Sequence, residues 1–282
     1  MSHTSPYCVS RSGSTLTSVT YAMIRGLGAL AFGLLAILGI SSTGQATSDV
    51  DEMFDTLAQA NRFVSVEPAG SRGAIGTTLG VGIVQTPIDQ NPEIMDAQLN
   101  GDFGRRDGAG TVESQRIWVT KGILTPIDIG LTAGTLGRGN ARQLGGSVQV
   151  TLVEGFRMPA LAIRAAHLRI DGMDETAFTT TGAEILAAWG ILGWVTPWIG
   201  LGANQHDGRI ETGLSGDGGY LLTQNETTKD FTRKWTTAEN TVGVIVALGS
   251  PFAQLALESR GNSLSGGSSE QRSVAVRLSL GI

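Results

Sequence analysis

The chain ends in Ser273-Val274-Ala275-Val276-Arg277-Leu278-Ser279-Leu280-Gly281-Ile282, where every second residue is a large aliphatic one. The residues between them are small or polar. Because successive side chains of a β-strand point to opposite faces, this pattern predicts a strand with one wholly apolar face. The other face is too small and polar to belong to a conventional hydrophobic core.

The same period-two alternation recurs along most of the chain. It is clear in 127–134, where Ile127, Ile129 and Leu131 alternate with Asp128, Gly130 and Thr132. Turn residues separate the runs, which predicts strands rather than one long segment. Ten strands are predicted, at 73–84, 113–124, 126–136, 142–153, 158–169, 177–189, 194–204, 235–248, 252–260 and 272–282.

The connections between these strands differ in length in a regular way. Tight turns at Leu124-Thr125, 154–157, 190–193 and Gly249-Ser250 alternate with the polar, mostly longer loops 85–112, 137–141, 170–176, 205–234 and 261–271. Short turns at one end and longer loops at the other are typical of transmembrane β-barrels. An even number of strands also brings both ends of the barrel to one side.

On these features the chain resembles bacterial outer-membrane β-barrel proteins over about residues 71–282. The resemblance implies an all-β fold, a transmembrane antiparallel up-and-down barrel of about 10 strands, located in the outer membrane. It also implies contact with outer-membrane lipid and insertion by the outer-membrane assembly machinery. One departure is the last residue, Ile282, where such proteins usually carry an aromatic residue.

A soluble β-barrel or sandwich would show the same alternation with its apolar face turned inward. The second face of these strands consists mainly of Gly, Ala, Ser and Thr with scattered charges. Such a face is a poor solvent surface and a reasonable lining for a lumen. The membrane interpretation is therefore favoured.

The first 46 residues are predicted to be a signal peptide. Met23-Ile24-Arg25 is a short basic region, 26–40 is apolar, and Gly44-Gln45-Ala46 offers a cleavage site. A permanent membrane helix is the alternative, but the apolar run is shorter than the ~20 residues of a membrane span. Residues 1–22 fit an over-extended start, with translation beginning at Met23. Cys8, the only cysteine, would be lost with the signal.

Residues 47–70 are predicted to be a periplasmic N-terminal segment, mainly helical. Met53, Phe54, Leu57 and Val64 recur at helical spacing, with acidic residues in the first turn. The helix could plug the barrel, lie at its inner rim, contact a partner, or simply lead into the first strand. The sequence leaves these alternatives open.

Composition excludes several classes of function. The formal net charge is −5 and the Lys and Arg residues do not cluster, which argues against nucleic acid as a partner. The mature chain would lack cysteine, and no His-x-x-His or calcium-loop spacing occurs, so neither a metal site nor a cofactor is predicted. The 40 glycines indicate turns and strands that tolerate small residues.

If the apolar faces contact lipid, charged residues within strands are expected to face the lumen, because charge on the lipid face is costly. Two pairs are expected across neighbouring strands, Lys121 with Asp128 and Arg164 with Glu184. They would either neutralise a narrow interior or select a solute. The predicted lumen charges are Lys121, Asp128, Arg164, Glu184, Glu239 and Arg277.

Three functions are compatible with such a barrel. The first is a non-enzymatic, narrow passive channel for water or small solutes, favoured by glycines on the predicted lumen face. The second is a surface-display, adhesin or receptor barrel acting through loops 85–112 and 205–234. The third is a barrel-embedded hydrolase using His206 and Asp207, since the ten-stranded omptin proteases use Asp-His pairs; no facing acidic pair completes that match.

Overall fold

A computed structural model gives the fold, and it describes residues 49–63, 67–88, 110–124, 126–137, 141–155, 158–173, 176–191, 194–210, 231–248, 253–263 and 271–281. The predicted signal peptide and most of loops 85–112 and 205–234 lie outside these residues. Among the residues described, no helix is long and apolar enough to cross a membrane. The elements are α2 (Asp49–Ala60), β1 (Thr77–Ile88), β2 (Gly110–Leu124), β3 (Ile127–Leu136), β4 (Arg142–Gly155), β5 (Met158–Met173), β6 (Thr176–Ala188), β7 (Val195–Ile210), β8 (Phe231–Ala247), β9 (Ala253–Ser263) and β10 (Gln271–Gly281).

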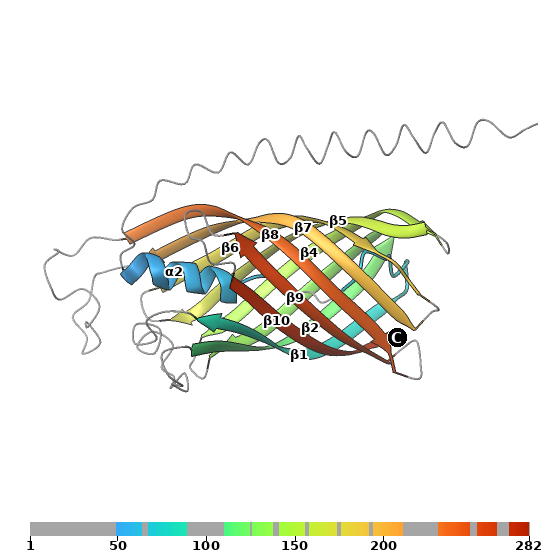
Figure 1. The fold of residues 1–282 in the computed structure, drawn as a ribbon, viewed down its shortest axis with the longest axis horizontal. Coiled ribbons are helices and arrows are strands. Elements are labelled where there is room, and N and C mark those ends of the chain that lie inside the picture. The colour runs from blue at the N-terminus through green and yellow to red at the C-terminus, as the bar shows by residue number, and fades with distance from the viewer. Residues whose placement is uncertain are drawn as a thin grey trace, which may run out of the picture. The chain divides into compact units, whose positions relative to one another are not determined.

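The ten strands form a closed barrel in which each strand pairs with its sequence neighbours and β1 pairs with β10 (Figure 1). Every pairing is antiparallel, and the seam between β1 and β10 joins Thr78 to Gly281 and Gln85 to Val274. Closure leaves no unpaired strand edge, which is the condition for crossing a lipid bilayer with strands. The predicted number and order of strands are confirmed.

The outer face of the barrel is apolar. Leu131, Leu144 and Leu201 each expose more than half of their side chains, and Val276 and Leu278 of the C-terminal strand expose nearly half. Buried side chains of the same strands include Arg116, Asp128, Arg164, Glu258 and Arg277. An apolar exterior around a charged interior is the reverse of a soluble barrel. The chain is thus a transmembrane β-barrel of the outer-membrane type, located in the outer membrane.

The C-terminal strand follows its predicted pattern. Ser273, Arg277 and Ser279 point into the barrel, and the aliphatic residues point outward. Arg277 pairs with Gly82 on β1, and its side chain passes over Gly80, where an added Cβ would lie 2.8 Å from the arginine Cδ. Glycine at Gly80 therefore leaves room for a long side chain.

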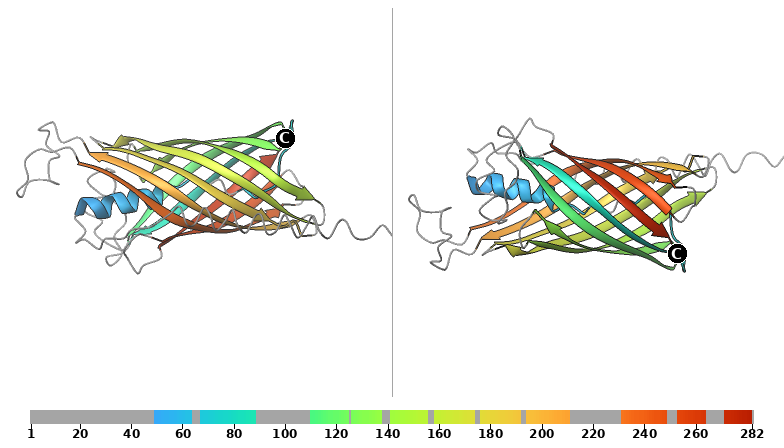
Figure 2. Two further views of the ribbon diagram at one scale, coloured as in Figure 1. Left: turned by 90° about the horizontal axis from the view of Figure 1, so that it is seen from above. Right: turned by 90° about the horizontal axis from the view of Figure 1, so that it is seen from below.

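The segment before β1 lies inside the barrel. Helix α2 occupies the end at which β1 finishes and β2 begins (Figure 2). Phe54, Leu57 and Ala58 are buried there, and Asn61, Arg62, Glu67 and Ala69 are buried further along. The helix predicted within 47–70 is present as α2. Of the alternatives left open by the sequence, the structure shows the plug.

Candidate functional site

The plug, defined as residues 54–63 and 67–72, lies inside the barrel and is bound by side chains of the wall. Its helix is held by an aromatic cluster near the end of the barrel that carries the longer connections. The Phe54 ring lies 6.1 Å from Phe178 on β6 and 6.0 Å from Trp235 on β8, and an added Cβ at Gly208 on β7 would approach the Phe54 ring to 2.5 Å. The wall is thus shaped around this phenylalanine.

His206 belongs to the same cluster and does not lie in a solvated loop. Strand β7 extends to Ile210, and the imidazole is completely buried, 5.1 Å from the Trp235 ring. Its two ring nitrogens lie 3.0 Å from the hydroxyl oxygens of Thr180 and Thr237. Both nitrogens are occupied by threonine partners on neighbouring strands, which gives His206 a structural place in the wall.

Asp207 faces the opposite way. It is partly exposed on the outer side of the barrel and pairs with Lys234 at 2.7 Å. Neighbouring residues in a strand point to opposite faces, so His206 and Asp207 cannot act on the same substrate atom. The predicted His206 and Asp207 pair is therefore wrong.

The C-terminal end of α2 is bound by side chains of the wall. Arg116 on β2 donates to the carbonyl oxygens of Ala60 at 2.8 Å and Arg62 at 2.6 Å. Gln143 on β4 donates to the Ala60 oxygen at 3.1 Å. The last carbonyl groups of a helix lack partners within the helix and carry partial negative charge, so a cation here is favourable.

A network of charges surrounds Arg260 on β9 in the middle of the lumen. Its guanidinium contacts Glu258 at 2.8 Å, Glu184 at 3.3 Å and also Glu239. It donates to the carbonyl oxygen of Phe63 in the plug at 2.9 Å. Arg164 also pairs with Glu184, at 3.0 Å, so two arginines share the three carboxylates where water is scarce.

Glu67 is the acidic centre of the plug. Its carboxylate lies 2.8 Å from Arg277, 3.0 Å from Arg72 and 2.8 Å from the Thr120 hydroxyl. Arg164 donates to the Glu67 carbonyl oxygen at 2.8 Å. Side chain and backbone of one plug residue are thus both held by arginines of the barrel wall.

The last part of the plug is fixed mainly through its backbone. Gln149 on β4 donates to the carbonyl oxygens of Pro68 and Gly70 at 3.3 Å, and Thr151 donates to that of Ala69 at 3.0 Å. The amide of Arg72 donates to the Asp128 carboxylate at 3.2 Å. The amide of Ser71 donates to Glu154 on β4, so side chains of β3 and β4 bind five consecutive positions, 68–72, close to the start of β1.

Five of the six predicted lumen charges point inward, as expected. Asp128, Glu239, Arg164 and Arg277 are buried, and Glu184 is nearly so. Arg164 lies opposite Glu184 in the pairing of β5 with β6, and the two side chains form an ion pair at 3.0 Å. The predicted pair is confirmed as a contact, whereas a role in selecting solutes is not tested by it.

Lys121 is the exception. It is exposed on the outer face, where its ammonium group donates to the carbonyl oxygen of Ile75 at 2.8 Å. It lies opposite Ile129, because an irregularity between Gly122 and Leu124 shifts the register and brings Gly122 opposite Asp128. A shift of one residue moves a side chain to the other face of the sheet, so the predicted pair of Lys121 with Asp128 is wrong.

Three wall residues of the network, Arg116, Glu258 and Arg260, were not predicted. The alternation of their strands could have placed them. Leu255 and Leu257 face lipid, so Glu258 and Arg260, which lie on the other face of the same strand, point inward. Ile117 faces lipid as well, so its neighbour Arg116 points inward.

A cavity of about 10 Å³ lies between Phe63 and the Arg260 network. That volume is about the minimum for a single water molecule. Among the residues described, no group of three or more His, Cys, Asp or Glu side chains could hold a metal ion.

Comparison with known proteins gives similarity of structure alone. No protein-family model matches the chain, and a search of curated proteins gives no match. Among solved structures, LpxR from Salmonella typhimurium aligns at 10% identity and TM-score 0.38, covering 72% of this chain and 99% of that one. OprG from Pseudomonas aeruginosa aligns at 12% identity and TM-score 0.33, covering 77% of this chain and 99% of that one. The N-terminal barrel domain of Pseudomonas aeruginosa OprF aligns at 9% identity and TM-score 0.34, covering 73% of this chain and 97% of that one.

Proposed function

We propose that this outer-membrane barrel is a self-plugged, non-enzymatic anchor that acts at the cell surface through loops 85–112 and 205–234. The observation that carries the proposal is the position of residues 54–63 and 67–72 inside the lumen, where side chains of the wall bind them at both ends and in the middle. A barrel closed in this way does not serve as a passive pore. Its activity then lies in the segments that leave its outer rim.

The contacts of the plug support a permanent rather than an incidental closure. Wall side chains bind the plug backbone at both ends, Arg116 at the end of α2 and Thr151 close to β1. In an open pore these groups would be expected to face water or solute. In this barrel, these wall side chains instead bind carbonyl groups of the plug.

The glycines of the lumen face also support this proposal. They led the sequence interpretation toward a narrow passage, but they adjoin atoms that fill the interior. An added Cβ at Gly182 would lie 1.9 Å from the Asn204 Oδ1, and one at Gly243 would lie 2.1 Å from the Trp198 ring. The small residues make room for packing, so they give no argument for an open channel.

The lengths of the connections favour the α2 end as the cell-surface end. The links between β1 and β2 and between β7 and β8 leave the barrel there, and they span 89–109 and 211–230. The opposite end has turns as short as the one between Leu124 and Ile127. Long loops are extracellular and short turns periplasmic in such barrels.

Conductance tests the closed lumen. The purified full chain is inserted into planar bilayers and compared with a variant that lacks 54–63, and folding of both is checked by their mobility on detergent gels before and after boiling. We expect no conductance steps from the full chain and steps from the variant. Stable steps from the full chain would instead establish the narrow channel as the function.

Deletion of 211–230 tests the surface role. Cells that expose the full chain and cells that expose the deletion variant are compared for attachment to abiotic and protein-coated surfaces, with deletion of 138–140 as the control. We expect reduced attachment for the first deletion alone, with barrel mobility on gels unchanged. Equal attachment of all three strains would argue against a role of this loop.

A further inference from the structure

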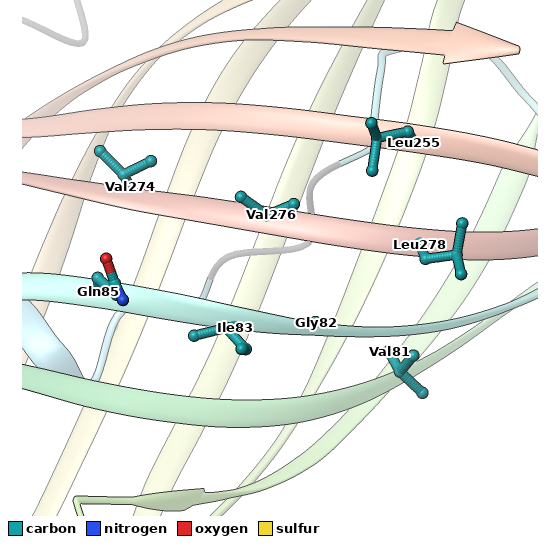
Figure 3. Close-up of a pocket in the computed structure, with 8 residues that line it drawn as sticks. All are labelled: Val81, Gly82, Ile83, Gln85, Leu255, Val274, Val276 and Leu278. Carbon is teal, nitrogen blue, oxygen red and sulfur yellow. The ribbon is translucent and has the colours of Figure 1, made fainter. Parts of the chain in front are cut away.

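The lipid-facing side of the barrel is hollowed at the seam where its first and last strands meet. A groove of about 330 Å³ runs over β1, β10 and β9 (Figure 3). That volume lies at the lower end of the range for small-molecule sites. Its lining residues are Val81, Gly82, Ile83, Gln85, Leu255, Val274, Val276 and Leu278.

The register explains why the apolar part of the groove is continuous. Val276 lies between Ile83 on β1 and Leu257 on β9, and Leu278 lies between Val81 and Leu255. All of these side chains are exposed on the outer face. These side chains form one apolar surface along the seam, and a groove in such a surface suits an extended hydrocarbon chain.

Toward the α2 end the groove becomes polar. Val274 lies between Gln85 on β1 and Ser259 on β9. Arg272 is the next outward residue on β10, it is exposed, and its neighbour on β9 is Gly261. An arginine, an amide and a hydroxyl thus follow an apolar groove on the same face of the barrel.

We propose that this seam binds one phosphorylated lipid of the outer leaflet, with an acyl chain in the groove and a phosphate at Arg272. The guanidinium group matches phosphate with paired hydrogen bonds, and charge-assisted bonds of this kind are strong near a bilayer surface. Gln85 and Ser259 supply further hydrogen-bonding groups to the same headgroup. The bilayer surrounds this face of the barrel, so a lipid is the occupant that the membrane itself supplies.

The leaflet follows from the direction of the strands. Arg272 and Gln85 lie near the end of the barrel with the longer connections, which is the extracellular end in outer-membrane barrels. The apolar part of the groove extends from there toward the middle of β10. A lipid with its headgroup at the outer surface fits this order, whereas one from the inner leaflet would place its headgroup beside Leu278.

Retention of lipid by the purified barrel tests the proposal. The full chain in detergent is mixed with bisphosphorylated lipid A, and bound lipid is counted by native mass spectrometry; dephosphorylated lipid A is measured in parallel. We expect one retained molecule of the phosphorylated lipid. We expect Arg272→Gln and Val276→Trp, which remove the cation and fill the groove, each to weaken retention about tenfold, a change of about 1.4 kcal/mol.

Two matched variants separate this site from general attraction to lipid. Arg142 and Leu144 lie outward on β4, away from the seam, so Arg142→Gln and Leu144→Trp should leave retention unchanged. Mobility on detergent gels shows that each variant is folded. Equal loss with Arg142→Gln, equal retention of the dephosphorylated lipid, or no retention by the full chain would each overturn the proposal.

Discussion

Replacement of Glu67 by glutamine removes the negative charge at the centre of the plug. The carboxylate is 2.8 Å from Arg277 and 3.0 Å from Arg72, and all three side chains are largely buried. Loss of one partner from a buried ion pair costs about 3–5 kcal/mol. Glutamine can still accept hydrogen bonds from Arg277 and Thr120, so we expect the lower end, about 3 kcal/mol, as the loss in free energy of plug binding.

Labelling of a cysteine on α2 measures this loss. Ala58 has no exposed surface in the barrel, so a thiol introduced by Ala58→Cys reacts with a bulky maleimide only when the plug opens. The native Cys8 is replaced by serine beforehand. If opening is in rapid equilibrium, the labelling rate follows the open population, and about 3 kcal/mol corresponds to a rate roughly a hundredfold higher.

A surface pair provides the control. Asp171 pairs with Arg169 at 2.5 Å on the exposed outer side, and because exposed pairs contribute little, Asp171→Asn should leave the labelling rate unchanged. Addition of Arg277→Met to Glu67→Gln should recover part of the loss, since the buried cation goes too. A labelling rate for Glu67→Gln equal to that of the parent would refute the view that ion pairs hold the plug.

Three further predictions concern the wall. Gly208→Ala should raise the labelling rate at Ala58→Cys, because the added Cβ meets the Phe54 ring and overpacking costs about 1–3 kcal/mol; an unchanged rate would mean that the ring moves freely. Leu257→Arg, in the middle of β9 on the lipid face, should cost about 2–4 kcal/mol and lower the temperature at which gel mobility shifts, and an unshifted temperature would contradict the assigned face. Asp128→Asn should also lower the temperature at which gel mobility shifts, because Asp128 is buried against Arg72. Lys121→Gln, on the exposed face, should change the free energy of unfolding by less than about 0.5 kcal/mol. Equal effects of the two substitutions would contradict the placement of Asp128 and Lys121 on opposite faces.

Much of the barrel could be predicted because its two faces differ so strongly. Lipid on one side demands large apolar residues, and a crowded lumen on the other admits glycine, threonine and paired charges. Where this contrast exists, as in β3 and β10, strand bounds and facing follow from period two alone. The irregularity after Gly122 breaks the period, so the sequence pattern assigns Lys121 to the wrong face of the sheet.

The contrast fades where strands extend beyond the apolar band. Around His206 the outward residues Gln205, Asp207 and Arg209 are polar, so alternation gives no apolar signal there. Strand β7 was consequently predicted to end before His206. The plug could be given only as one of several alternatives, because the helical period of α2 indicates a buried face without indicating which surface covers it.

The direction of the plug constrains the order of assembly. The segment is joined covalently to β1 at the short-turn end, while α2 lies near the opposite rim. To reach this position after β1 and β10 have paired, a helix of about 10–12 Å diameter would have to pass along the lumen. We therefore expect the strands to close around an N-terminal segment that is already in place, so that this segment serves as the template for closure of the barrel.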